Sequence, residues 1–136
     1  MNKTIQGMIT SLNENEIFVF GSNLGGRHGA GAARLALRWG AVMGNPSGIQ
    51  GMTYAIPTKS ANIRRTLSID EIKPYADEFI KYANEHPERT FLLTDVGCGL
   101  AGLEPEEIAP LFCEALDIPN IKIHSNFMDV LLKHSA

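Results

Sequence analysis

Ile17-Phe18-Val19-Phe20-Gly21-Ser22-Asn23 is the stretch that decides the fold class of this chain. Its first four residues form an unbroken apolar run of β-branched and aromatic side chains, which glycine and polar residues then end. A continuous run of this kind, without the alternation of a half-exposed strand, is typical of a strand that is buried on both faces. The sequence therefore predicts a sheet with helices covering both of its sides.

Outward from this strand, apolar runs alternate with helical patterns. Residues 30–39 are rich in Ala and Leu and predict a helix that Gly40 ends, whereas residues 43–51 predict a turn-rich connection. Ser68 and Glu71 have the spacing of a capping box, which marks the start of another helix. Strands are also predicted at 53–57, 90–95 and 121–123, and helices from Pro105 onward and over 128–133. Such alternation predicts one α/β domain over residues 1–136 with a largely parallel sheet.

The composition excludes several classes of protein. With 136 residues, 44% of them hydrophobic and 20% charged, the chain has the make-up of an ordinary globular domain. The formal net charge of -3 argues against binding nucleic acid by electrostatics alone. Two cysteines are too few for a disulfide scaffold or a cysteine-based zinc site, so we expect no metal and no cofactor. Without a secretory signal or a membrane-spanning apolar run in the sequence, we expect a cytoplasmic protein that does not bind membranes.

Two glycine-rich segments carry the functional signal. Residues 24–31 hold four glycines in eight residues, and residues 97–102 form a second glycine-rich loop. Glycine lets backbone N–H groups approach a ligand without a Cβ in the way. Both segments follow predicted strands, and ligands bind beyond the carboxyl ends of parallel strands. Together they predict a ligand site at this edge of the sheet.

Two common nucleotide-binding patterns are absent. The chain has no G-x-x-x-x-G-K-[ST] motif, which excludes a Walker-type NTPase. The segment 29–34 lacks the third small residue of the dinucleotide fingerprint, and no acidic ribose partner follows about 20 residues later. Dehydrogenase chemistry on NAD is therefore disfavoured.

The amino-acid sequences of the two loops resemble those of the macrodomain family. Residues 18–24, followed by Gly-Arg-His-Gly-Ala-Gly-Ala-Ala, are similar to the macrodomain start, in which a strand ending in Asn leads through glycines into an Ala-rich helix. Residues 94–103, followed by 105–109, look like the later strand, its phosphate loop and the next helix. The resemblance extends from about residue 9 to residue 127. It implies a single-domain three-layer α/β/α fold with a mixed, largely parallel sheet.

A finer resemblance is to macrodomains that remove ADP-ribose from DNA bases or acidic side chains, including the antitoxin DarG type. The matching residues are Ile56-Pro57-Thr58-Lys59, then Arg64 or Arg65 and Ser68, together with the Gly-Cys-Gly-Leu wording at 97–100. This resemblance implies binding of ADP-ribose or a related NAD-derived nucleotide, and hydrolysis of ADP-ribose from a modified nucleic-acid base or acidic side chain.

The resemblance also implies ligand-binding residues. In the first loop these are Gly25, Gly26, Gly29 and Gly31, which would let the backbone wrap the distal ribose, and also Arg27 and Ala30. In the second loop they are Gly97, Cys98, Gly99, Leu100 and Ala101, whose backbone N–H groups would donate to the diphosphate, and also Gly102. Phe127, after the last predicted strand, would lie near the adenosine or belong to the core.

Lys59, Asn23 and His28 are the candidate catalytic residues. By resemblance, Lys59 attacks or orients the anomeric carbon of the ribose. This needs a lowered pKa, to which Arg64 and Arg65 would contribute positive charge; the alternative is a solvated surface lysine. Asn23 would bond the distal ribose, or else cap a turn. His28 would serve as acid or base, or else satisfy a backbone carbonyl.

Two positions depart from the family pattern. Met8 stands where many macrodomains have an Asp that reads the adenine amino group, and Ala101 stands where some Lys-dependent relatives have an Asp. Binding tolerates these departures better than catalysis does, so a non-catalytic reader of ADP-ribose is the alternative function. The expected partner is ADP-ribose or an ADP-ribosylated macromolecule, with nucleic acid only as a modified substrate. A nucleic-acid-binding module without a nucleotide pocket is the third hypothesis, and the net charge disfavours it.

Overall fold

A computed structural model describes residues 2–135 of the protein, which form a six-stranded sheet. The strand order is β1-β6-β5-β2-β4-β3, and every neighbouring pair is parallel except β3 and β4. The strands are β1 (Thr4–Ile5), β2 (Glu16–Asn23), β3 (Gly48–Gln50), β4 (Thr53–Lys59), β5 (Thr90–Leu93) and β6 (Ile121–His124). The mixed, largely parallel sheet that the sequence predicts is confirmed.

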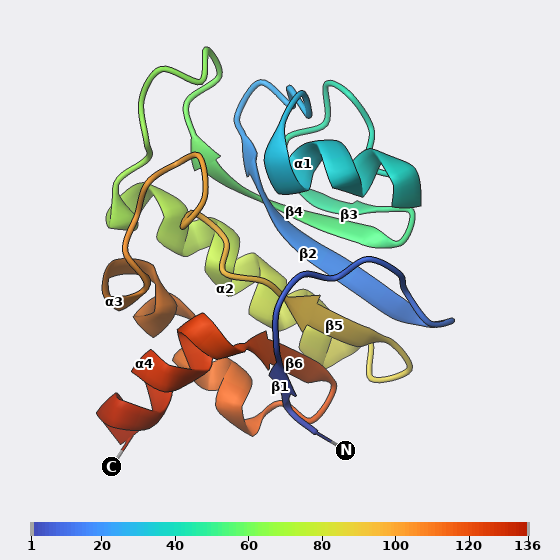
Figure 1. The fold of residues 1–136 in the computed structure, drawn as a ribbon, viewed down its shortest axis with the longest axis vertical. Helices are drawn as coiled ribbons and strands as arrows, with labels where there is room; N and C mark the ends of the chain where they lie inside the picture. Colours follow the sequence, from blue (N-terminus) through green and yellow to red (C-terminus); the bar gives the residue numbers. More distant parts are fainter. Residues whose placement is uncertain (1, 136) are drawn as a thin grey trace.

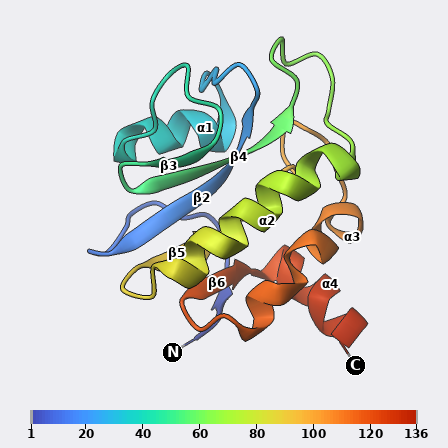
Figure 2. The ribbon, with the colours of Figure 1, turned by 180° about the vertical axis from the view of Figure 1, so that it is seen from behind.

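Helices lie on both faces of the sheet, as the predicted three-layer α/β fold requires. Figure 1 looks onto the face that α1 (Gly31–Ala36) covers, and Figure 2 looks onto the face that α2 (Ile69–Glu85) covers. The other helical elements are α3 (Pro105–Ile108), α4 (Ser125–Ser135) and two 3-10 helices, η1 (Leu37–Trp39) and η2 (Ala109–Asp117).

The central strand separates two apolar clusters of unequal size. Ile17 and Val19 point into the larger cluster, which α2, η2 and α4 complete. Phe18 and Phe20 point the other way, into a smaller cluster with Ala33 of α1. The continuous apolar run of β2 is therefore explained by burial on both faces.

The α1 face of the sheet is covered by two different kinds of structure. α1 packs over β2, while the N-terminal segment 6–13, rather than a helix, crosses β5 and β6 (Figure 1). Ile9 and Leu12 of this segment pack against the Phe18 cluster. A cavity at the carboxyl ends of the central strands is lined by residues of both α1 and this segment.

The capping box at the start of α2 is confirmed. The Oγ atom of Ser68 accepts a hydrogen bond from the Glu71 N–H at 3.2 Å, and the Glu71 carboxylate accepts one from the Ser68 N–H at 2.9 Å. The same carboxylate holds Arg65 at 2.7 and 3.0 Å. Glu71 therefore fixes both the helix start and the end of the preceding loop.

The sequence did not reveal every element. β3 lies inside the connection predicted as turns, and β1 was not predicted, because both are short edge strands without a long apolar run. The helix predicted from Pro105 changes to a 3-10 helix at Ala109, since Pro110 has no N–H to donate to the preceding turn.

Candidate functional site

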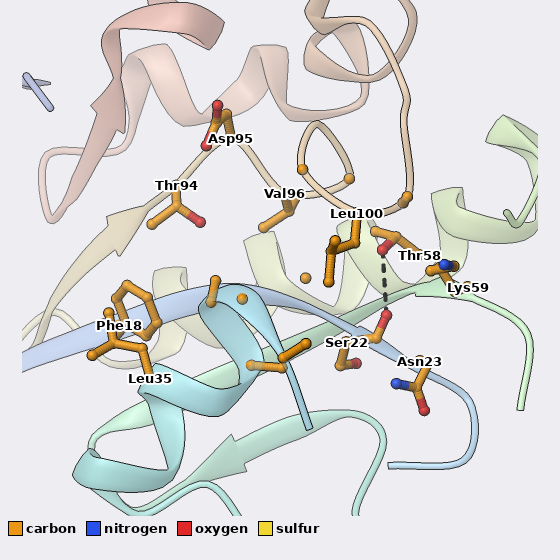
Figure 3. Close-up of a pocket in the computed structure, with 18 of the residues that line it drawn as sticks. Phe18, Ser22, Asn23, Leu35, Thr58, Lys59, Thr94, Asp95, Val96 and Leu100 are labelled. Carbon is orange, nitrogen blue, oxygen red and sulfur yellow. Dashed lines mark hydrogen bonds between the residues drawn. The ribbon is translucent and has the colours of Figure 1, made fainter. Parts of the chain in front are cut away.

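A cavity of about 1100 Å³ opens at the carboxyl ends of β2, β4 and β5, next to α1 (Figure 3). Ligand sites in proteins usually measure about 300–1,000 Å³, so this cavity can hold a molecule as large as a dinucleotide. Its walls come from the segment before β2, from both glycine-rich loops and from the ends of β4, β5 and β6.

Ten of the predicted site residues line this cavity, although they come from three separate parts of the chain. They are Asn23, Arg27, Gly29, Ala30, Gly31, Lys59, Gly97, Gly99, Leu100 and Ala101. The other predicted residues lie outside its lining: Gly25, Gly26, His28, Cys98, Gly102 and Phe127. The topological rule that placed both loops at one edge of the sheet thus brings most of the predicted set together.

The second glycine-rich loop holds unpaired backbone donors on residues that line the cavity. The N–H groups of Gly97, Gly99, Leu100 and Ala101 have no hydrogen-bond partner within residues 2–135, and all four residues line the cavity. The remaining two N–H groups of the loop are occupied. That of Cys98 donates to Asp95 O at 3.1 Å, and that of Gly102 donates to Gly99 O at 3.0 Å. The prediction that Cys98 also donates its N–H to a ligand is therefore wrong, because this N–H is used within the loop.

Gly25 and Gly26 are needed by the packing of the first loop. A Cβ on Gly25 would lie 2.5 Å from the Ala61 carbonyl oxygen. Gly26 has a φ of +64°, and a Cβ there would lie 2.4 Å from the backbone of Gly44. Both contacts are with backbone, which cannot move aside as a flexible side chain can. The two glycines hold neighbouring loops together, and neither lines the cavity as the ribose-wrapping role would require.

Gly29 and Gly99 differ from this pair. Both line the cavity, neither has a φ that disfavours other residues, and no heavy atom lies within 4 Å of the place where a Cβ would stand. Backbone strain and packing therefore do not require glycine at either position. The absence of a side chain at Gly29 and Gly99 leaves open space in the cavity.

The side-chain amide of Asn23 closes a turn. Its Nδ2 donates to Arg27 O at 2.8 Å, and its Oδ1 accepts from the Arg27 N–H at 2.9 Å. Asn23 therefore caps a turn, which is one of the two roles that the sequence predicts for it. Asn23 also lines the cavity, and one hydrogen of its Nδ2 is left for a ligand.

Lys59 ends β4 as a half-buried residue on the cavity wall (Figure 3). Its ammonium group has no hydrogen-bond or ion-pair partner in the described part of the chain. Arg65, which was expected to add positive charge near Lys59, is instead paired with the Glu71 carboxylate. The Glu71 carboxylate thus largely compensates the positive charge of Arg65, and the Arg64 side chain is exposed to solvent. Neither guanidinium group is therefore held beside Lys59 by a hydrogen bond or ion pair in the described residues.

His28 is completely buried and does not line the cavity. Its Nε2 lies 3.2 Å from Asn45 O, and its ring meets the Phe20 ring edge-on at 5.4 Å. The structure therefore places His28 in the alternative role of satisfying a carbonyl. The predicted acid or base role is wrong, because a ligand in the cavity cannot reach the imidazole.

Phe127 belongs to the core. Its side chain is completely buried and stacks on Phe112 with ring centroids 5.7 Å apart. Because α4 begins at Ser125, residue 127 falls in the first helical turn and faces the apolar cluster. The expected contact with adenosine is thereby excluded.

The Cys98 thiol packs against the larger apolar cluster. Burial, with a further contribution from the Asp95 carboxylate, raises its pKa to about 12. A thiol of this kind is a poor nucleophile at neutral pH.

Several cavity residues escaped the sequence analysis. They are Ser22, Thr58, Ile63, Thr94, Asp95, His124 and Asn126. Thr58, Thr94, Asp95, His124 and Asn126 stand at, or just beyond, the carboxyl ends of strands. The rule that found the glycine loops therefore points to them as well. Nothing in the sequence around Ile63 indicates that this residue lines the cavity. It has a φ of 58°, which is rare for a β-branched residue.

No protein-family model matches this chain, and no curated protein matches it significantly. None of the helices in the described part combines the length and apolar character that crossing a bilayer requires. Nowhere in residues 2–135 do three His, Cys, Asp or Glu side chains gather closely enough to hold a metal ion.

Proposed function

We propose that this protein binds ADP-ribose, or a closely related NAD-derived nucleotide, in the cavity between its two glycine-rich loops. One observation carries the proposal: the four unpaired N–H groups of Gly97, Gly99, Leu100 and Ala101 on the cavity wall. The consecutive free amides of residues 99–101, together with that of Gly97, form a set of donors that suits an anion such as a diphosphate. The resemblance of both loops to those of macrodomains supports ADP-ribose as the molecule that carries the diphosphate.

The charges near these amides fit the same ligand. Arg27 and Lys59 line the cavity and supply positive charge to a protein that is acidic overall. A hydrogen bond to a charged group contributes about 1.5–3 kcal/mol, and micromolar affinity corresponds to about 8 kcal/mol. Three or four such bonds therefore account for most of a micromolar affinity.

We further propose that the bound group is removed from a modified base or acidic side chain by hydrolysis. The bond between the anomeric carbon of the distal ribose and its carrier breaks, and the oxygen of water takes the carrier's place. The water proton goes to the departing base, or to solvent where the carrier leaves as a carboxylate. Lys59 is the residue that we assign to attack or orient this carbon, because its side-chain nitrogen is unpaired in the described residues and stands on the cavity wall. If Lys59 attacks, its neutral amine displaces the carrier, and water then cleaves the new C–N bond and restores the lysine. The alternative is a reader that binds ADP-ribose without cleaving it.

We place this activity in the cytoplasm. The two cysteines are free thiols, which a reducing compartment preserves.

Calorimetric titration of ADP-ribose into the purified protein, with AMP as the comparison ligand, tests the proposal. We expect saturable micromolar binding of ADP-ribose and weaker binding of AMP, which lacks the second phosphate and the distal ribose. Gly99→Glu should abolish binding, because it places a bulky negative group in the open space beside the free amides. Asn84→Glu adds the same charge on an exposed position of α2 outside the cavity and should bind as the parent does. Absence of heat and of a thermal shift at millimolar ADP-ribose would reject the proposed ligand.

A further inference from the structure

The cavity is electrostatically asymmetric. Lys59 lies at the end of β4, and Asp95 lies just beyond β5. In the sheet β2 separates these two strands, so their ends are two strand spacings apart, about 10 Å. Figure 3 shows the two side chains on opposite sides of the cavity. One side of the cavity thus offers the Lys59 cation and the other side a carboxylate, while the loop with the free amides continues the chain from Asp95.

The Asp95 carboxylate is held in one orientation. Its Oδ2 accepts a hydrogen bond from Nδ2 of Asn126 at 2.8 Å, and its Oδ1 has no partner within the described residues. The Asn126 backbone N–H in turn donates to Nδ1 of His124 at 3.1 Å. The His124 Nε2 lies 3.2 Å from the carbonyl oxygen of Gly7.

This chain of contacts defines the state of His124. Since the carbonyl oxygen of Gly7 can only accept and the Asn126 N–H can only donate, these two contacts fit the imidazole tautomer that carries its hydrogen on Nε2. His124 therefore links the N-terminal segment to the start of α4, and Asn126 keeps the carboxylate in place. Gly7, Asp95, His124 and Asn126 all line the cavity.

The walls beside Asp95 are apolar. Met8, with 86% of its surface exposed, and Ile9 come from the N-terminal segment, and Phe18 and Leu35 come from β2 and α1. A planar ring can insert between such surfaces with its edge toward the carboxylate. A phosphate is repelled from this end, because an ionised carboxylate can only accept hydrogen bonds.

We propose that Asp95 is a specificity-determining residue that selects a nucleobase with an exocyclic amino group. With the diphosphate on the second glycine-rich loop, the base lies at the acidic end, and Oδ1 of Asp95 accepts a hydrogen bond from its amino group. Asn126 is the positioning residue. A base that presents a carbonyl oxygen at the same place meets a second acceptor and is disfavoured. This inference rests on the nucleotide binding proposed above and names the feature of the base that the site reads.

The test compares ADP-ribose with inosine diphosphate ribose, in which a carbonyl replaces the amino group of the base. We expect the parent protein to prefer ADP-ribose by about ten- to hundredfold in Kd, which corresponds to about 1.4–2.8 kcal/mol. Asp95→Asn should reduce this ratio to within about threefold, since an amide can present either a donor or an acceptor. Asn126→Ala should lower the ratio to an intermediate value.

Asp129→Asn provides the matched control. Asp129 is exposed on α4 and does not line the cavity, so this variant removes one negative charge without touching the site. It should keep the full preference for ADP-ribose. Thermal unfolding of each variant verifies that the fold is retained.

The outcomes separate this inference from the proposed function. If neither ligand binds the parent protein, the proposed function itself fails. Equal binding of both ligands by the parent would leave the proposed function intact and overturn the role of Asp95. The role is also overturned if Asp95→Asn keeps the full preference, or if it weakens both ligands equally while remaining folded.

Discussion

Thr66 donates its side-chain hydroxyl to the carbonyl oxygen of Ala101 at 2.6 Å. Its backbone also forms an isolated antiparallel bridge with Lys59. One residue therefore joins the end of β4, which carries the unpaired lysine, to the loop that carries the free amides. The two parts of the cavity are positioned relative to each other by this contact.

Thr66→Val should weaken ligand binding more than it weakens the fold. It removes the hydroxyl but keeps the β-branched shape, and a single hydrogen bond stabilises by about 0.5–1.5 kcal/mol. We expect a Kd for ADP-ribose about three- to tenfold higher, with a small change in Tm. Thr66→Ser retains the hydroxyl and should restore most of the affinity. Equal affinity of the Val and Ser variants would contradict the positioning role.

Lys59→Ala should separate binding from catalysis. If Lys59 acts on the anomeric carbon, release of ADP-ribose from a modified substrate should fall at least about a hundredfold. The Kd for free ADP-ribose should change by less than about tenfold, because the loop amides remain. Lys81→Ala, at an exposed position on α2, should alter neither quantity. Tight binding of ADP-ribose by the parent protein without any release from a modified substrate would instead favour the non-catalytic reader.

The glycines divide into two classes that unfolding experiments can distinguish. Gly99→Ala should leave the free energy of unfolding unchanged, or raise it by up to about 1 kcal/mol, because the backbone tolerates alanine and the space is open. Gly26→Ala should lower it by more than about 2 kcal/mol, since a positive φ and a backbone clash act together. Urea denaturation measures both. Similar values for the two variants would refute the division.

The two thiols should differ in reactivity. With a pKa raised to about 12 by burial, Cys98 carries little thiolate at pH 8, whereas Cys113 is exposed. Treatment of the folded protein with iodoacetamide should label Cys113 and spare Cys98, as read by peptide mass spectrometry. Unfolding in urea should make both reactive. Fast labelling of Cys98 in the folded state would show that its loop is more open than described.

Acid should remove the contribution that the Arg65–Glu71 pair makes to the stability of the fold. The hydrogen bonds from Arg65, and then those from Ser68, lower the pKa of Glu71 from its ordinary value of 4.5 to about 2. A depressed carboxyl pKa gives stability that is present above pH 4.5 and is lost as the pH falls toward 2. The difference in Tm between the parent and Glu71→Gln should therefore shrink from pH 5 to pH 3. A difference that stays constant over this range would mean that the charge of Glu71 does not matter.

The sequence was sufficient for the framework of the site. The apolar run at 17–20 placed a buried strand at the centre of a parallel sheet, and the position of both glycine loops after strands placed them at one edge. These predictions depend on local patterns and on the topology of parallel strands, both of which the chain itself encodes.

Local sequence patterns could not predict the roles of individual residues within the loops. Gly25 and Gly99 look alike in the sequence, yet one meets the backbone of Ala61 and the other faces open space. The direction of the Phe127 ring depends on where α4 begins, and the burial of His28 depends on the distant segment around Asn45. Long-range packing decides each case, and no spacing of residues in the chain reveals it.

The incomplete cover on the α1 face makes an occupant of the cavity part of the folded architecture. A bound nucleotide would fill the cavity that α1 and the N-terminal segment line, and would touch residues from Gly7 to Asn126, which lie near opposite ends of the chain. Because a ligand that binds only the native state stabilises it by RT ln(1 + [L]/Kd), the protein becomes harder to unfold as nucleotide accumulates. At a hundredfold excess over Kd this gain is about 2.7 kcal/mol, a substantial fraction of the stability of a typical domain. The lifetime and abundance of the protein would then increase with the concentration of its own ligand.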